Sequence, residues 1–319
     1  MTNPGTAVQT QPFAPLARDL ARIGLGTSAF RIARQDAAFG VLDAWAELGG
    51  DLVDLAARYG AGEAETVLGT WMAARNARDG VVILTKGAHP DAAWRSRMTP
   101  KAIASDLRAS LDRLGTDVVD IYMLHRDDPA VPVGEIVDAL HEQVVAGRAR
   151  SVGVSNWTIP RIDAALAYSA DRGRTPITSS SVYVGLAPWR EPPWPDCVDG
   201  RDPISQAWYG GSGGLPNFAW SAQSGGVFAD DFDAARVAPE IAAAWDTPET
   251  EALRLRARAV ARELRATAAQ VAIAYVLGAA GAPFALTGAR DPDALRAAWG
   301  AVDLSLSEEQ RQWLERGEA

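Results

Sequence analysis

The chain has 319 residues, of which 48% are hydrophobic and 22% charged, as is typical of a globular protein large enough to bury a sizeable core. Its formal net charge is −9 and it has no Lys/Arg run, so we expect no binding to nucleic acid, which requires clustered positive charge. The single cysteine, Cys197, excludes an internal disulfide and a thiolate metal cluster, and no metal site is predicted.

The N-terminal residues 1–20 lack the basic start and the continuous apolar segment of a signal peptide. The expected location is therefore the cytoplasm. We interpret residues 1–20 as an extension and residues 21–319 as one domain.

Short apolar runs alternate with amphipathic segments along almost the whole chain. The first four pairs are IGLG (23–26) with 36–48, DLVDL (51–55) with a helix from Ala61, VVILT (81–85) with 99–115, and VVDIYML (118–124) with 133–147. The next four are ARSVGV (149–154) with 159–173, PITSS (176–180) with a long connection, LPNFAWSA (215–222) with a helix over 247–264, and PFALTG (283–288) with 291–300. Eight strand-helix units without a break in composition predict a (β/α)8 TIM barrel, an α/β fold.

The connection over 188–215 interrupts this alternation of apolar runs and amphipathic segments. Its first part, within APWREPPWPDCVDG, is rich in proline and tryptophan, and YGGSGGLP (209–216) is rich in glycine, so neither is expected to be regular. The sixth helix is accordingly the least evident. The connection follows the sixth strand, on the face where barrel enzymes keep their sites, which indicates a functional loop.

Residues 266–289 carry no charge and approach the length of a membrane span. Gln270, the break at Gly278–Gly281 and Pro283 favour a buried helix, a turn and a buried strand instead. We therefore expect no association with a membrane.

The stretch GLGTSA (24–29) matches the dinucleotide fingerprint G-x-G-x-x-A. In that motif the glycine turn enters a helix directly, whereas here the helical pattern resumes only near Asp36. A dinucleotide-binding fold also predicts about six strands followed by a second domain, but this chain continues to alternate.

Polar residues gather at the predicted carboxyl ends of the strands. Asp54 and Tyr59 follow the second strand, Lys86 the third and His125 the fourth. In a barrel these ends converge on one mouth. An ammonium near a phenol lowers its pKa, and Lys86, oriented by Asp54, is expected to act in this way on Tyr59. With His125 bonded to a carbonyl oxygen, the group would suit proton donation to an alkoxide.

Several separated stretches resemble the aldo-keto reductase family, in order and over almost the whole chain. They are DLVDLAARYGAGEAETVLG, ILTKG, DLRASLDRLGTDVVDIYMLHRDD, GRARSVGVSNW and ALTGARDPDAL. The resemblance implies a barrel that binds NADPH (or NADP+) across its mouth and an NADPH-dependent oxidoreductase acting on carbonyl or alcohol substrates. By position it implies the catalytic tetrad Asp54, Tyr59, Lys86 and His125, with Tyr59 as the general acid.

The resemblance also implies a set of cofactor-binding residues. Ser155 and Asn156 match residues that hold the nicotinamide carboxamide, and Trp220 matches the aromatic ring that stacks on the nicotinamide. Ser181 stands where many members have glutamine. The remaining candidates are Gly26, Thr27, Ser221, Gln223, Gly225, Gly288 and Arg290. Arg290 would contact the 2′-phosphate, unless it only pairs with Asp291 or Asp293 at the surface.

Other interpretations stay open. A cofactor-bound regulatory or interaction protein is one, because the cytoplasmic subunit of voltage-gated potassium channels resembles this family. A physiological dehydrogenase of a sugar or cyclitol alcohol is another. Tryptophans that follow the strands, namely Trp157, Trp189, Trp194 and Trp208, either pack in the core or line a pocket. Trp189 and Trp194, with Arg190, Glu191 and Asp196, favour a sugar-like substrate. His89 and His141 are interpreted as residues without a catalytic role.

Overall fold

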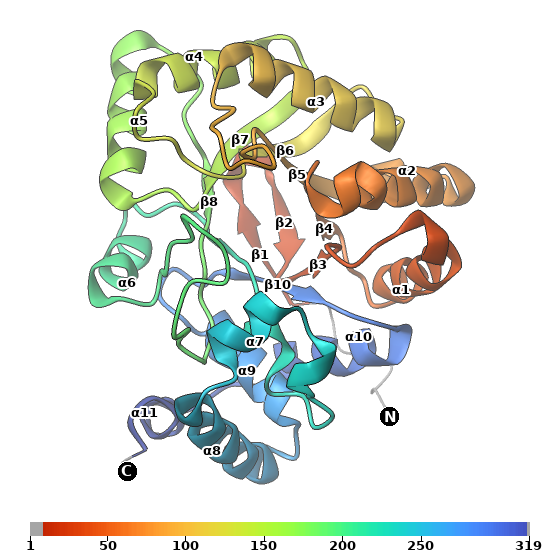
Figure 1. Cartoon of the computed structure of the whole chain (residues 1–319), viewed down its shortest axis with the longest axis vertical. Coiled ribbons are helices and arrows are strands. Elements are labelled where there is room, and N and C mark those ends of the chain that lie inside the picture. The colour runs from red at the N-terminus through yellow and green to blue at the C-terminus, as the bar shows by residue number, and fades with distance from the viewer. Residues whose placement is uncertain (1–8, 318–319) are drawn as a thin grey trace.

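The computed structural model of the protein describes residues 9–317. Eight parallel strands form one sheet in the order β8-β7-β6-β5-β4-β3-β10-β9, with helices packed outside it (Figure 1). A parallel bridge between Ser180 and Asn217 joins the edge strands β8 and β9 and closes the barrel. The strands are β3 (Ile23–Gly26), β4 (Leu52–Asp54), β5 (Val82–Gly87), β6 (Val119–Leu124), β7 (Ala149–Ser155), β8 (Ser179–Ser181), β9 (Phe218–Ala219) and β10 (Phe284–Gly288). The predicted (β/α)8 fold is confirmed.

Helices follow the strands as the alternating pattern predicts. Those after the first five barrel strands are α1 (Gln35–Glu47), α2 (Glu63–Arg75), α3 (Pro100–Leu114), α4 (Val133–Val145) and α5 (Ile159–Arg172). The remaining ones are α6 (Pro203–Gly210), α7 (Pro239–Trp245), α8 (Pro248–Leu264), α9 (Ala268–Leu277), α10 (Pro292–Trp299) and α11 (Glu308–Arg316). Side-chain caps fix several starts, since Thr99 accepts a hydrogen bond from Ala102 N and Asp291 accepts one from Ala294 N.

The connection after β8 contains helix α6, which the sequence only weakly indicated. Asp202 caps it by accepting hydrogen bonds from Ile204 N and Ser205 N, and Pro203 occupies the first helical position. The helix runs on to Gly210, so the prediction of irregular structure over 209–216 is wrong for its first two residues. The cap stabilises the start of the helix. The glycines destabilise the helix little, because they lie at its end rather than in its interior.

The uncharged stretch 266–289 forms α9, a turn and β10, as predicted. Helix α9 begins with a capping box in which Thr267 and Gln270 bond each other's backbone N–H groups. Within residues 9–317, no helix is both long and apolar enough to cross a bilayer.

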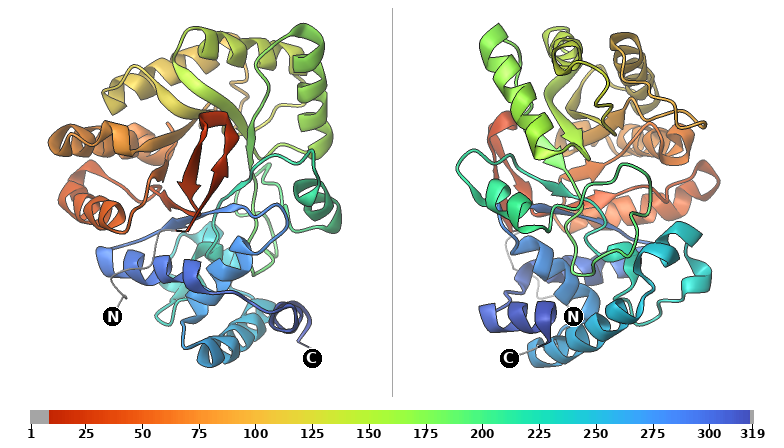
Figure 2. Two further views of the ribbon diagram at one scale, coloured as in Figure 1. Left: turned by 180° about the vertical axis from the view of Figure 1, so that it is seen from behind. Right: turned by 60° about the vertical axis from the view of Figure 1, so that its left-hand side comes forward.

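An N-terminal hairpin, which the sequence did not indicate, adjoins the start of β3. Its strands β1 (Thr10–Phe13) and β2 (Arg18–Ala21) pair antiparallel, and Figure 2 shows it over the end of the barrel. The Phe13 ring meets the rings of Phe218 and Phe284 edge-on, with centroids 5.5 and 6.1 Å away. Of the expected extension, residues 1–8 lie outside the described residues, and the hairpin residues pack into the apolar interior of the barrel.

Candidate active site

The predicted polar residues lie at strand ends that open on the same mouth of the barrel. Asp54 is the last residue of β4, Lys86 lies near the end of β5, and His125 directly follows β6. Together with Tyr59 they line one cavity of about 860 Å3. The structure therefore brings the four proposed catalytic side chains together.

Backbone geometry places Tyr59 against this group. A short 3-10 segment, Tyr59–Gly62, follows β4, and Gly60, Ala61 and Gly62 in it all have left-handed φ angles (59°, 54° and 96°). Glycine adopts such angles without steric cost, whereas most other residues do not. The glycine after Tyr59 thus permits the tight turn that directs the phenol back toward the strand ends.

Lys86 connects the group through its ammonium. Its Nζ donates to the carboxylate of Asp54 and to the carbonyl oxygen of Leu55 at 3.0 Å, and lies 3.4 Å from Tyr59 Oη. Tyr59 Oη lies 3.5 Å from Asp54 Oδ2, and its ring meets the His125 ring edge-on at 5.8 Å. Lys86 and Asp54 are only 2% and 4% exposed, so this ion pair is buried.

Burial and charge act on these groups in different directions. Burial lowers the pKa of Lys86, but Asp54 and Tyr59 outweigh it, so the pKa lies above its ordinary value. Burial and the Asp54 carboxylate raise the pKa of Tyr59, and Lys86 offsets them only in part. The expected lowered phenol pKa is therefore absent from the protein alone, because a sequence does not show how strongly the phenol is desolvated.

His125 is 8% exposed. Burial, followed by the cations Lys86 and Arg126, lowers its pKa well below the ordinary value, so the imidazole is neutral near pH 7. Its Nδ1 is buried and has no hydrogen-bond partner among residues 9–317. A neutral imidazole carries one N–H, which makes it a hydrogen-bond donor that adds no charge to the cavity.

The residues predicted to hold the nicotinamide are interlocked by hydrogen bonds. Ser155 Oγ donates to Ser181 O at 3.0 Å, and Asn156 Nδ2 donates to Ser155 Oγ at 3.0 Å. Trp220 Nε1 donates to Asn156 Oδ1 at 3.2 Å, while Ser181 Oγ donates to Phe218 O at 2.8 Å. All four predicted residues line the cavity, and this network fixes their positions.

The other predicted cofactor residues also line the cavity, except one. Those that line it are Gly26, Thr27, Ser221, Gln223, Gly225 and Gly288. Thr27 Oγ1 donates to Asp54 O at 2.8 Å, which ties β3 to β4. Arg290 does not line the cavity: its side chain is 69% exposed and forms ion pairs with Asp231 and Asp291.

Several lining residues were not predicted or were assigned no role. His89, interpreted as a loop residue without a catalytic role, lies in the cavity with its ring 5.0 Å from that of His125. Arg126, Trp94 and Cys197 also line it. The sequence could have indicated His89 and Arg126 by their positions just after β5 and β6, since side chains at those points face the mouth.

Of the four tryptophans considered as pocket walls, only Trp194 lines this cavity. Trp157 is buried in the core, and Trp208 Nε1 donates to Asp163 at 3.2 Å. Trp189 stacks on Tyr183 with centroids 4.6 Å apart. These three tryptophans pack against other parts of the protein.

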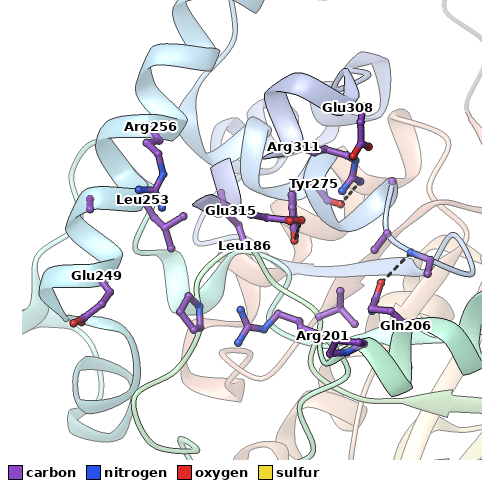
Figure 3. A pocket seen from close by; sticks show the side chains of 17 residues that line it. Leu186, Arg201, Gln206, Glu249, Leu253, Arg256, Tyr275, Glu308, Arg311 and Glu315 are labelled. Atoms are coloured by element: carbon purple, nitrogen blue, oxygen red, sulfur yellow. Dashed lines mark hydrogen bonds between the residues drawn. The ribbon is translucent and has the colours of Figure 1, made fainter. Parts of the chain in front are cut away.

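A second cavity of about 880 Å3 lies on the outside of the barrel, among α6, α8, α9 and α11 (Figure 3). Tyr275 Oη donates to Glu315 at 2.7 Å, and Arg311 donates to Tyr275 O at 2.7 Å. Three arginines and three glutamates line it, so their formal charges balance, and none of the predicted site residues is among its lining.

The structure is thus a (β/α)8 barrel with Tyr59, Lys86, Asp54 and His125 gathered at its mouth beside a hydrogen-bonded network. The sequence profile described as "Aldo/keto reductase family" matches residues 22–316, so the chain belongs to that family. The predicted resemblance is confirmed.

Individual relatives agree with this assignment. The aldo-keto reductase ausK of Aspergillus calidoustus is 36% identical over 163 residues, which are 47% of this chain and 40% of that protein. Aryl-alcohol dehydrogenase GME11368 of Pestalotiopsis microspora is 29% identical over 89% of this chain and 73% of its own length. The chain spans less than half the length of the first curated relatives it matches.

Solved structures show the same fold. An aldo-keto reductase from Klebsiella pneumoniae in complex with NADPH superposes with a TM-score of 0.72 at 24% identity, and the match covers 98% of this chain and 95% of that one. At this identity the likeness supports the fold alone.

Proposed function

We propose that the protein is an NADPH-dependent reductase of aldehydes or ketones in which Tyr59 is the proton donor. The observation that carries this proposal is the arrangement of half-buried Tyr59 with buried Lys86, Asp54 and His125 around one cavity. Such a group fits hydride transfer, because the carbonyl oxygen needs a proton as it becomes an alkoxide.

The side chains divide the chemistry between them. The Tyr59 hydroxyl gives its proton to the carbonyl oxygen, and Lys86, held by Asp54, orients Tyr59 Oη and favours the phenolate that remains. Neutral His125 donates a hydrogen bond to the same oxygen, which polarises the carbonyl group. In the reverse direction the phenolate takes the proton of an alcohol, so one site serves reduction and oxidation.

The residues at the mouth fit NADPH. Gly26, Gly288 and the indole of Trp220 all line the cavity, and glycine adds no side chain to it. A Cβ at Gly288 would meet only the carbonyl oxygen of Gly26, at 3.9 Å, so the surface there is open. When bound, NADPH supplies the hydride, while Ser155, Asn156, Ser181 and Trp220 hold the nicotinamide.

The substrate that the cavity fits best is an aromatic aldehyde. Of the residues that favoured a sugar, Trp189, Arg190, Glu191 and Asp196 are not in the cavity lining, which leaves Trp194 alone. Trp94 and Trp194 provide flat apolar walls, which suit an aryl ring. The names of relatives, among them aryl-alcohol dehydrogenase GME11368, support the same choice.

The test is turnover with purified protein. NADPH oxidation should be seen with benzaldehydes, more weakly with aliphatic and sugar aldehydes, and the matched alcohols should reduce NADP+. NADPH that binds but is not consumed with any carbonyl compound would contradict the proposal and favour a regulatory or interaction protein.

A further inference from the structure

Arg126 is a buried cation in the cavity that the proposed reaction does not use. It directly follows His125 and is 5% exposed. Its Nη1 donates to the carbonyl oxygen of His125 at 2.8 Å, and its Nε to that of Pro195 at 3.3 Å. Nη2 lies 3.6 Å from Cys197 Sγ, and a thiol sulfur is only a weak acceptor.

No carboxylate neutralises this guanidinium among residues 9–317. The acidic side chains of the adjoining segments are engaged elsewhere: Asp54 pairs with Lys86, Asp127 pairs with Arg161 at 3.2 Å, and Asp196 accepts a hydrogen bond from Trp94 Nε1 at 3.0 Å. A guanidinium has five N–H groups, and only three hydrogen bonds are formed here. Two N–H groups of this buried charge thus have no hydrogen-bond partner among residues 9–317, and the residue lines the cavity.

A buried charge without a counterion is costly, because it has lost water and gained no opposite charge. Other cations increase the cost, since the exposed Arg58 and the paired Lys86 line the same cavity. Burial, followed by Arg126 and Arg58 among the cations, lowers the pKa of His89, and burial, Lys86 and Arg126 lower that of His125. This side of the cavity is therefore suited to an anion.

The anion belongs to the substrate rather than to the cofactor. The predicted cofactor residues lie at the ends of β3 and of β7 to β10. Arg126 follows β6, and its contacts at Pro195 and Cys197 adjoin Trp194 on the substrate wall. The guanidinium thus lies at the wall that a substrate ring would contact.

We propose that Arg126 binds a carboxylate of the substrate, so that the preferred substrates are aromatic aldehydes carrying a carboxylate group. The inference rests on the proposed reductase function. Tyr59 and His125 would hold the aldehyde oxygen, Trp94 and Trp194 would flank the ring, and Arg126 would receive the carboxylate. A guanidinium fits a carboxylate through two parallel hydrogen bonds.

The first test uses the unaltered protein. Initial rates with para- and meta-carboxybenzaldehyde are compared with those of their methyl esters, which remove the charge and add one methyl group. At least one acid should have a kcat/KM about 10- to 100-fold above that of its own ester, the scale of hydrogen bonds to a charged group. Esters that are used as well as both acids would overturn the proposal.

The second test uses Arg126→Gln. This variant should lose the preference for the acid, so that the ratio of kcat/KM for the acid to kcat/KM for its ester falls to about one. Arg22→Gln is the matched control, because Arg22 also donates to a backbone carbonyl but lies at the opposite end of the barrel. An equal loss for acid and ester would show that Arg126 only anchors the loop, and a matching loss of NADPH affinity would assign it to the cofactor. Either result would overturn the proposal.

A binding measurement separates this proposal from the reductase proposal. Calorimetric titration of para-methylbenzoate, which cannot react, should show binding to the original protein and binding weakened about 10- to 100-fold in Arg126→Gln. If this holds while no carbonyl compound is turned over, the reductase proposal fails and the anion site stands. If benzaldehyde is reduced but para-methylbenzoate binds both proteins equally, the anion site fails alone.

Discussion

On one side of the barrel mouth, where β4, β5 and β6 end, Asp54 and Lys86 form a buried ion pair, and the neutral His125 is buried in the lining of the same cavity. We call Asp54, Lys86 and His125 the acid-base side. On the other side, where β9 and β10 end, the one charged residue that was predicted, Arg290, is exposed and pairs at the surface. We call the loops after these two strands the phosphate side.

The two sides should respond differently to substitution. Removing one partner of a buried ion pair leaves the other desolvated and uncompensated, so such a change should weaken the fold as well as the proposed chemistry. An exposed ion pair contributes little to stability and is screened by salt. Changes on the acid-base side should therefore affect turnover and folding, whereas changes on the phosphate side should affect only cofactor binding.

The largest effect is expected for Tyr59→Phe. Loss of the hydroxyl removes the proton donor but keeps the ring that meets His125, so kcat should fall by about 10²- to 10⁴-fold. NADPH affinity should hardly change. Steady-state rates and a cofactor titration measure both, and turnover within about threefold of the original protein would refute the role of Tyr59.

Lys86→Met tests whether the acid-base side also stabilises the fold. Asp54 would remain buried without its partner, so the free energy of unfolding should fall by roughly 3–5 kcal/mol, as measured by urea denaturation. Adding Asp54→Asn should restore much of this loss but no activity. The control is Arg75→Met, which breaks an exposed ion pair with Asp43 and should cost much less than Lys86→Met.

If Lys86→Met and Arg75→Met lower the free energy of unfolding equally, the buried pair matters no more to the fold than an exposed pair. The expected difference between the two sides would then be wrong.

His125 should make stability depend on pH. Its pKa in the folded protein lies well below that of the unfolded chain, so only the unfolded chain takes up a proton just below about pH 6.5. The stability contributed by the neutral imidazole is therefore complete above that pH and is lost as the pH falls. Between about pH 7.5 and 5.5 the loss should be on the order of 1 kcal/mol.

Urea denaturation at both pH values checks this. The loss should be smaller in His125→Gln, in which His89, whose pKa burial also lowers, would still contribute. His141→Gln, on α4 and away from the cavity, serves as the control and should retain it. A loss of equal size in all three proteins would show that other groups cause the pH dependence.

The acid-base side could be predicted from the sequence because it depends on which residue follows each apolar run. The second, third and fourth apolar runs each have a polar residue at the carboxyl end, and a parallel barrel brings such ends together without further information. Asp54, Lys86 and His125 are therefore found at their predicted places.

The sequence did not predict contacts between distant segments. Phe13 packs on Phe218 and Phe284, which are more than half the chain length away in sequence, so no local pattern indicates the hairpin. Arg126 meets the loop near Pro195 in the same manner. The raised pKa of Tyr59 was not predicted either, since it depends on a balance between burial and charge that only the packed structure provides.

The smallest effect is expected for Arg290, on the phosphate side. To reach a 2′-phosphate, its guanidinium must leave Asp231 and Asp291, so the gain from the phosphate is reduced by the loss of these exposed pairs. Arg290→Ala should weaken NADPH by about tenfold or less and leave NADH unchanged, with a smaller difference at high salt. Asp231→Asn should do the opposite and tighten NADPH by a few-fold, because it frees the guanidinium. Titrations that follow tryptophan fluorescence measure all four combinations. If Arg290→Ala weakens both cofactors equally, or Asp231→Asn leaves NADPH binding unchanged, Arg290 has no part in recognising the phosphate, and the phosphate side lacks the charged contact proposed for it.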